Sequence, residues 1–455
     1  MPARRSPAAG GALGPIRQAA RDTPPERERH ADLMRAVAIG FVVLGHWLVV
    51  LVTYDDVTGL AGRSALGVVG WMVPLTWLFQ VMPVFFLVGG YANAASWRSH
   101  RSRGGSSPDW LLGRFRRLLR PTTVFLAVVA GAALLARTVG TEDRLVGTAT
   151  WLVTMPLWFL VVYLAVVALT PVTHRLHVRF GLAVPLALAA PVGLADLLGL
   201  GLGLPYVDGS SYLLAWLAVH QLGYAWQDGS LLARRGVAVT MAVVGALALV
   251  LLTVLGPYPV SMVAVPGETV QNTAPPTLAL LALAVTQTGV VLLLRRPADR
   301  WLARSERTWT AVVAVNAVVL TVFLWHMAAV VVSAVLLVPT GLIPQPSPGS
   351  GEWLAWRVPW LAALTLVLTV LVLLFARVEI AARAAAPPRG GRSRWPLTVL
   401  GLVAVVAGLL TITLSGRGVH GPAGLPTGAL LLYGSGVAAL ASAARASRDG
   451  DGAVI

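Results

Sequence analysis

Arg35 and His46 lie in the first long apolar stretch of the chain, which runs from Asp32 to Leu51. Eleven steps along an α-helix return to within about 20° of the same face and rise about 16 Å, so one face of a helix would carry both side chains. If this helix spans a bilayer, Arg35 lies at one surface and His46 near the middle, where an ionisable group is costly and usually functional. A neutral imidazole there is suited to accept a hydroxyl proton as a general base, although a hydrogen bond to a neighbouring helix would explain it equally well.

Four more side chains are candidates for the lining of a cavity around His46. Tyr91 and Asn93 follow the glycine pair Gly89-Gly90, which permits close helix packing. Trp158 opens another apolar stretch, where it could equally belong to an aromatic belt. His326 is predicted to lie at a depth comparable to that of His46, and from sequence the two histidines could line one cavity or be unrelated.

Arg117 and Arg120 lie in the segment WLLGRFRRLLRP, residues 110–121. Their spacing of three residues places them on one helical face. Arginine binds phosphate with two parallel hydrogen bonds, so the segment is a candidate site for a phosphorylated cofactor. The competing explanation is that arginines beside a membrane span contact lipid headgroups and set the orientation of the chain.

The composition is that of a membrane protein. Hydrophobic residues make up 56% of the 455-residue chain and charged residues 12%, and the mean hydropathy is +0.75. The formal charge of +16 comes from arginines in short loops, which argues for membrane orientation rather than nucleic-acid binding. The chain contains neither lysine nor cysteine, so it cannot use a Schiff-base lysine, a disulfide or a thiolate metal site, and no metal is expected.

Twelve apolar spans are predicted, from residues 33–53 to residues 427–444, of which 211–227 and 427–444 are the least certain. Arginines gather in alternate loops, such as residues 98–120 between the second span (71–96) and the third (121–139). This pattern places both termini in the cytoplasm. Residues 1–30 lack an apolar period and are predicted to form a disordered basic tail. No loop is long enough for a soluble domain, so any chemistry must occur within the bundle or at its edges.

Taken in order, these motifs resemble the acyltransferase 3 family of bacterial membrane O-acyltransferases. The first helix of the family carries an arginine, ten residues and a histidine, as Arg35 and His46 do. The resemblance continues through MPVFFLVGGY, Arg117-Leu-Leu-Arg120-Pro121, LWFL at 157–160 and LWH at 324–326. It implies an all-α polytopic membrane protein with a ten-helix acyltransferase-3-like bundle over residues 31–380. Residues 381–455 would add about two C-terminal transmembrane helices and a short cytoplasmic tail.

The family resemblance implies a bacterial inner-membrane enzyme that transfers an acyl group, often acetyl, from cytoplasmic acyl-CoA to a hydroxyl of a glycan, glycolipid or similar acceptor. His46 would be the catalytic histidine and Arg35 its partner on the same helix, while Arg117 and Arg120 would contact the donor phosphates. Acyl-CoA would be a substrate, with no permanently bound cofactor. One departure is that the family commonly has a serine where this chain has Gly89. No intramembrane glutamate is evident after LWFL.

Two other functions fit parts of the same pattern. Twelve spans with both termini inside are a common layout of transporters and exporters, and buried histidines suit proton coupling. A catalytically silent membrane scaffold would fit the missing serine. The lack of a repeat relating the two halves disfavours the transporter, and the sequence does not define the acceptor, the acyl length or the oligomeric state.

Overall fold

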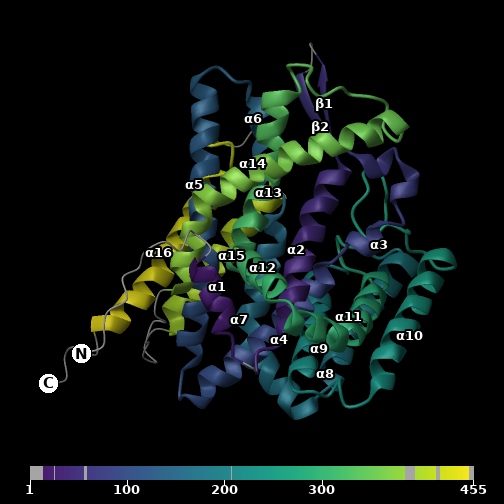
Figure 1. Cartoon of the computed structure of the whole chain (residues 1–455), viewed down its shortest axis with the longest axis vertical. Helices are drawn as coiled ribbons and strands as arrows, with labels where there is room; N and C mark the ends of the chain where they lie inside the picture. The colour runs from purple at the N-terminus through teal and green to yellow at the C-terminus, as the bar shows by residue number, and fades with distance from the viewer. Residues whose placement is uncertain are drawn as a thin grey trace.

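The computed structural model describes residues 14–24, 26–55, 59–205, 207–384, 395–416 and 421–449. Most of these residues lie in long helices (Figure 1). The described residues also contain one small sheet of two strands. Eleven helical segments among them are long and apolar enough to cross a membrane. Helix α9, with 17 residues, is shorter. The prediction of an all-α polytopic membrane protein is confirmed, as expected for a chain whose backbone groups must be paired internally in a bilayer.

The first part of the bundle contains most of the predicted site residues. Its elements are α2 (Arg29–Val49), β1 (Val50–Asp55), β2 (Gly59–Ser64), the 3-10 helices η1 (Ala65–Gly67) and η2 (Gly70–Met72), α3 (Thr76–Phe79), α4 (Met82–Ser102), α5 (Ser107–Thr138), α6 (Asp143–Thr154), α7 (Leu157–Phe180), α8 (Ala183–Asp196), the π-helix η3 (Leu197–Gly201) and α9 (Ser211–Gln227).

The second part of the bundle adds the helix that carries His326 and closes the structure around α2. Its elements are α10 (Arg235–Val254), α11 (Leu278–Arg304), α12 (Glu306–Ala317), α13 (Val319–Leu337), α14 (Gly351–Ala384), α15 (Trp395–Leu414) and α16 (Thr427–Asp449). Packing of α13 against both α2 and α14 places His326 in the interior of the bundle.

Helix α2 ends at Val49, earlier than the predicted span of 33–53. The apolar run continues, but its largely β-branched residues extend as strand β1, which pairs antiparallel with β2 and sets Val50 opposite Ser64. His46 therefore lies in the last turn of α2 and not halfway along it. The predicted end of the helix at residue 53 is wrong, because the hydropathy of this run did not distinguish helix from strand.

Helix α5 begins well before the predicted start of its span at residue 121. The side chain of Ser106 caps the helix by accepting the backbone N–H of Asp109 at 3.3 Å. Pro121 lies inside the helix without ending it. Arg117 and Arg120 consequently lie on α5 itself, in the turns before Pro121, and both side chains are exposed.

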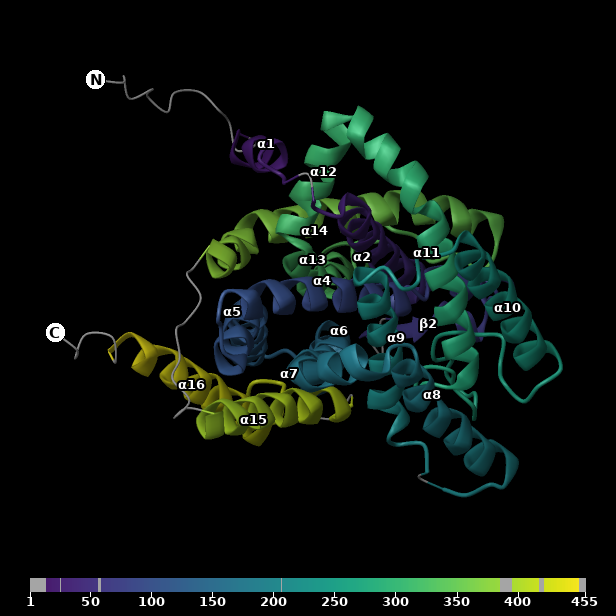
Figure 2. The ribbon, with the colours of Figure 1, turned by 90° about the horizontal axis from the view of Figure 1, so that it is seen from below.

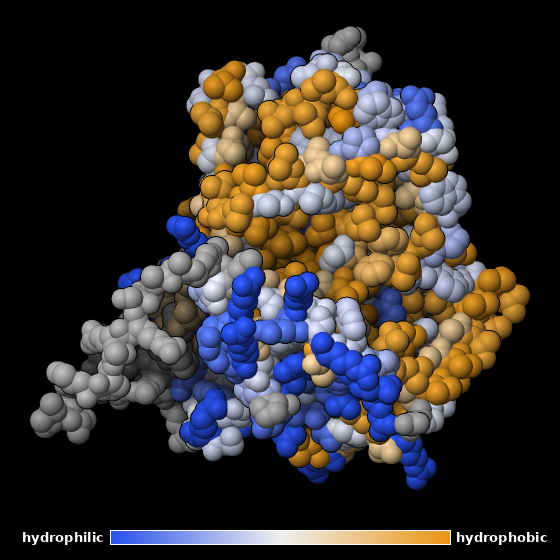
Figure 3. Space-filling view, in the orientation of Figure 1, coloured by the Kyte–Doolittle hydropathy of each residue, from blue (hydrophilic) through white to orange (hydrophobic). Residues whose placement is uncertain are grey.

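The two ends of the bundle differ in character. At the end where α2 gives way to the β1–β2 hairpin, which we call the hairpin end, the surface is largely hydrophobic (Figure 3). At the other end α2 begins, α4 ends and α5 begins, and hydrophilic residues gather in the lower part of the same view. We call this the basic end, after Arg98, Arg101, Arg117 and Arg120.

The predicted disordered tail is wrong for residues 14–21, which form helix α1 (Gly14–Arg21). This helix packs against α12, where the indole Nε1 of Trp309 lies 3.1 Å from both the carbonyl oxygen of Ala20 and the hydroxyl of Thr23. An ion pair of 2.8 Å joins Arg21 to Glu306. Tertiary contacts thus order a segment that has no apolar period of its own. Residues 1–13 and 25 of the predicted tail lie outside the described residues.

Helices α15 and α16 form the C-terminal pair that was predicted beyond the ten-helix bundle. They lie side by side along the edge formed by α5 and α7 (Figure 2). A Cβ on Gly408 would lie 2.7 Å from the backbone nitrogen of Tyr433, so the absence of a side chain permits this close approach. The hydroxyl of Tyr433 lies 2.8 Å from that of Thr123 on α5, which fixes the pair to the bundle. Residues 385–394, 417–420 and 450–455 of the predicted segment 381–455 lie outside the described residues.

Candidate functional site

His46 and His326 form a hydrogen-bonded pair. Nδ1 of His46 lies 3.0 Å from Nε2 of His326, and the two rings stack with centroids 5.0 Å apart. On the far side of His326, Nδ1 lies 2.6 Å from the carbonyl oxygen of Phe323. The structure thus resolves the relation between the two histidines that the sequence left open.

The partners of the two rings define where the protons are. A carbonyl oxygen only accepts, so Nδ1 of His326 donates to Phe323, and Nε2 of a neutral His326 carries a lone pair. Nδ1 of His46 must then donate to that lone pair. The remaining nitrogen of a neutral His46, Nε2, is left without a proton, as a general base requires.

Helix α13 is held in the position that this pairing requires. The indole Nε1 of Trp47 on α2 donates to the backbone oxygen of His326 at 3.0 Å. At the start of α13, the buried carboxylate of Glu379 accepts the backbone N–H groups of Leu320 and Thr321 at 3.3 and 2.8 Å. The hydroxyl of Thr321 also donates to it at 2.8 Å. A carboxylate at a helix N-terminus satisfies free N–H groups and favours the helix dipole.

Of these two supports, only Glu379 has a recognisable pattern in the sequence. Glu379 and Arg383 are four residues apart, and their side chains form an ion pair of 2.5 Å within α14. An acidic residue at the end of a long apolar stretch is expensive unless it is paired, so Glu379 could have been identified as buried. Trp47 directly follows His46, but no sequence pattern indicated its partner on α13.

His46 lines a cavity of about 1260 Å³. Its walls come from α2, the β1–β2 hairpin, α6, α7, α9, α13, the loop before α11, and α15. Trp158, Phe159 and Phe323 are among the lining residues. Most lining side chains are apolar, and among the described ones Arg63 of β2 alone carries a permanent charge. The cavity therefore extends from His46 toward the hairpin end of the bundle.

Tyr91, Asn93 and His326, which we predicted as possible cavity lining, are not among the described lining residues. His326 is fully buried behind His46. Tyr91 packs against Trp226 with ring centroids 4.7 Å apart. Asn93 is buried, with Nδ2 3.1 Å from Nε2 of His220 on α9. Tyr91 and Asn93 both lie at the middle of α4, where α9 packs against this helix.

The glycine pair before Tyr91 is explained by packing. A Cβ on Gly90 would lie 2.0 Å from the backbone oxygen of His220, so α4 and α9 touch through their backbones here. A Cβ on Gly89 would lie 3.0 Å from the ring of Tyr163. The space that the serine of the resembled motif would need is thus bordered closely by this tyrosine ring.

Arg35 lies far below His46 on α2, at the basic end. Its Nη1 lies 3.3 Å from the carboxylate of Asp32 and 3.5 Å from the side-chain oxygen of Asn316. Asp32 also pairs with Arg27 at 2.6 Å. Since about 16 Å of helical rise separates Arg35 from His46, the two cannot touch. Arg35 therefore belongs to a charged cluster at the surface and not to the histidine pair.

The described lining of the large cavity includes neither Arg117 nor Arg120, nor Arg35. The expectation that these arginines and His46 border one shared space is not met by this cavity, which opens on the other side of the histidine. Their side chains reach the surface of the basic end instead.

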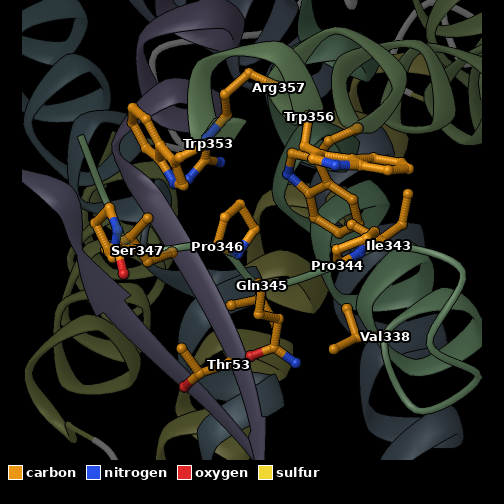
Figure 4. A pocket seen from close by; sticks show the side chains of 14 residues that line it. Thr53, Val338, Ile343, Pro344, Gln345, Pro346, Ser347, Trp353, Trp356 and Arg357 are labelled. Atoms are coloured by element: carbon orange, nitrogen blue, oxygen red, sulfur yellow. The ribbon is translucent and has the colours of Figure 1, made fainter. Parts of the chain in front are cut away.

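A second, smaller pocket of about 320 Å³ lies on the opposite side of strand β1. Figure 4 shows Trp353 and Arg357 on one side of it and Trp356 with Pro344 on the other, with Pro346 between them. Nη1 of Arg357 donates to the backbone oxygen of Val50 at 3.2 Å. This pocket is separate from His46 and contributes nothing to the histidine pair.

A family model described as an acyltransferase domain matches residues 30–377. The match runs from the first turn of α2 into α14, so it includes both histidines of the pair, Arg117 and Arg120. Helices α15 and α16 lie beyond it. No curated protein and no solved structure matches the chain.

Proposed function

The chain belongs to the acyltransferase 3 family, and we propose that it transfers an acyl group, in the first instance acetyl, from acyl-CoA to a hydroxyl of a cell-envelope glycan, glycolipid or similar acceptor. The single observation that carries the proposal is the pairing of His46 with His326 at 3.0 Å, beside a cavity large enough for a substrate. This pairing supports His46 as a general base, because it leaves Nε2 of His46 free to accept a proton.

In the proposed reaction, the acceptor hydroxyl attacks the carbonyl carbon of the thioester, and Nε2 of His46 takes the hydroxyl proton. The C–S bond then breaks, and the imidazolium returns that proton to the leaving sulfur. The products are an ester and the free thiol of coenzyme A. A positioned base typically accelerates such a step about 10²–10⁴-fold.

The donor is proposed to bind at the basic end. Arg117 and Arg120 are exposed there on α5 and could hold the phosphates of coenzyme A. Arg35, which is held by Asp32, would add positive charge to the same end. The thioester lies at the far end of the long pantetheine arm, so phosphates bound at the surface leave the acyl group free to reach toward His46.

The acceptor is proposed to approach from the hairpin end, through the large cavity. Arginine-rich ends of membrane proteins face the cytoplasm. With the basic end inside, the cavity opens away from the cytoplasm, where envelope glycans and glycolipids are found. We therefore place the protein in the bacterial inner membrane as a multi-pass enzyme with both termini in the cytoplasm.

The test is acyl transfer by purified protein in lipid nanodiscs, supplied with labelled acetyl-CoA and membrane extract. The wild-type protein should yield labelled acceptor, and His46→Ala should lower turnover about 10²–10⁴-fold. Its fold is checked by an unchanged thermal unfolding midpoint. Wild-type turnover by a folded His46→Ala variant would remove His46 from the mechanism. Absence of any labelled acceptor with the wild-type protein would favour a transporter or scaffold.

A further inference from the structure

Helix α15 forms part of the wall of the cavity that contains His46, although it lies outside the matched acyltransferase domain. Its lining residues are Val406, Leu410, Thr413 and Leu414. Their spacing of four, three and one residues places them on one face of the helix. Helix α15 is thus structurally part of the cavity that contains His46.

This wall is apolar and partly open. Val406, Leu410 and Leu414 offer only hydrocarbon, and the hydroxyl of Thr413 donates to the backbone oxygen of Leu410 at 2.8 Å. Leu410 is 43% exposed and Leu414 is 75% exposed. Because these two side chains border both the cavity and the outer surface of the bundle, the cavity is open alongside α15, at a face that would contact lipid.

The polar lining lies in other elements. Arg63 and Ser64 come from β2, Gln271 comes from the loop before α11, and His46 comes from α2. One cavity therefore combines a polar mouth at the hairpin, a base, and a hydrocarbon wall beside the membrane. That distribution fits a molecule with a hydroxyl-bearing polar head and an apolar chain.

We propose that α15 is the acceptor-specificity wall of the enzyme, and that the acceptor is a lipid-linked hydroxyl compound whose chain packs against Val406, Leu410 and Leu414. The proposal rests on the proposed function, since it assigns the occupant of the cavity as acceptor. The glycine contact of α15 with α16, and the attachment of α16 to α5 through Tyr433, hold this wall in place.

The first experiment measures binding of an acceptor-like molecule at α15 and does not depend on catalytic activity. Because the chain contains no cysteine, Leu410→Cys introduces a single thiol on the wall. Leu400→Cys is the control, since Leu400 lies about 80° around α15 from Leu410 and ten residues before it, is 66% exposed and does not line the cavity. Each variant is labelled in nanodiscs with an alkyl methanethiosulfonate, with and without dodecyl β-D-glucoside. At ten times the dissociation constant of the glucoside, labelling at position 410 should slow about tenfold. Labelling at position 400 should not change.

Two results would overturn the proposal in this arm. One is equal protection at both positions, which indicates simple partition of the probe into the bilayer. The other is protection at position 410 by dodecylphosphocholine as strong as that by the glucoside, which indicates a lipid groove with no preference for a hydroxyl-bearing head.

The second experiment reads specificity with labelled acetyl-CoA and either octyl or dodecyl β-D-glucoside as acceptor. Val406→Trp and Leu410→Trp should each raise the KM for the dodecyl compound about tenfold while changing the KM for the octyl compound less than threefold, since only the longer chain reaches the wall. Leu400→Trp is the control, and its KM values for both glucosides should match those of the wild-type protein. An unchanged ratio of the two KM values in both wall variants contradicts the proposal. If the wild-type protein acetylates neither glucoside, the labelling arm still decides whether α15 binds the chain, and the proposed transfer to such acceptors is what fails.

Discussion

His326 accepts the Nδ1 proton of His46 across 3.0 Å, although 280 positions separate the two residues in the chain. The pair joins α2, the first helix of the matched domain, to α13, the last helix but one of that domain. Because the contact fixes which nitrogen of His46 is free, it is the structural basis of the predicted chemistry.

The role of His326 is tested by removing its acceptor nitrogen. His326→Phe keeps an aromatic ring but leaves Nδ1 of His46 without its partner, so kcat should fall about tenfold, the equivalent of one lost hydrogen bond. The KM for acetyl-CoA should stay within twofold, because the donor phosphates bind elsewhere. His326→Gln, whose amide oxygen can accept the same proton, should recover part of the loss. A wild-type kcat for His326→Phe would show that His46 needs no orienting partner.

Arg117 and Arg120 are expected to bind the donor. Arg117→Ala and Arg120→Ala should each raise the dissociation constant of acetyl-CoA about tenfold, since a charge-assisted hydrogen bond contributes about 1.5–3 kcal/mol. The difference in affinity between these variants and the wild-type protein should become smaller at high salt, because salt screens exposed charges. Arg144→Ala is the matched control, because Arg144 is an exposed arginine at the start of α6. The dissociation constants are measured by calorimetry. If both variants bind acetyl-CoA with wild-type affinity, the two arginines contribute only to the orientation of the chain in the membrane.

Gly90 is expected to be indispensable for the contact between α4 and α9. In Gly90→Ala, the new methyl group would lie 2.0 Å from the backbone oxygen of His220. Because a backbone atom cannot rotate away as a side chain can, the free energy of unfolding should fall by about 3 kcal/mol or more. Gly40→Ala is the control, since a Cβ there meets no atom within 4 Å and alanine favours a helix by up to about 1 kcal/mol. Thermal unfolding in detergent compares the two. A Gly90→Ala variant as stable as wild type would refute the close approach.

Glu379 is expected to stabilise the start of α13, and so the position of His326. Glu379→Gln keeps one oxygen but removes the charge that faces Arg383, so the free energy of unfolding should fall by about 2 kcal/mol. Glu352→Gln, at an exposed position in the first turn of the same helix, should leave stability unchanged. Equal unfolding midpoints for the two variants would show that the buried carboxylate is dispensable.

The membrane character, the placement of most spans and the family could all be predicted from the sequence, because they depend on hydropathy and short local motifs. The pairing of His46 with His326 could not, since the spacing within one helix does not define how two distant helices are rotated toward each other. The end of α2 was misplaced because Val50 and Val52 are as apolar in a strand as in a helix. The helix over residues 14–21 was missed because its order depends on Trp309, far along the chain.

The charged cluster of Arg35 illustrates the same limit. Its spacing from His46 was read correctly as one helical face, yet a shared face does not imply a shared cavity. Asn316, which helps to hold Arg35, comes from α12 and had no sequence pattern to identify it.

Strand β1 is a partition with a compartment on each side. Val52 faces the histidine cavity and also borders the tryptophan-lined pocket around Pro346. The two cavities therefore share a single strand as their dividing wall, and the position of Val52 bears on the size of both. Arg357 anchors the start of this strand through its hydrogen bond to the backbone oxygen of Val50, from the side of β1 that does not border His46.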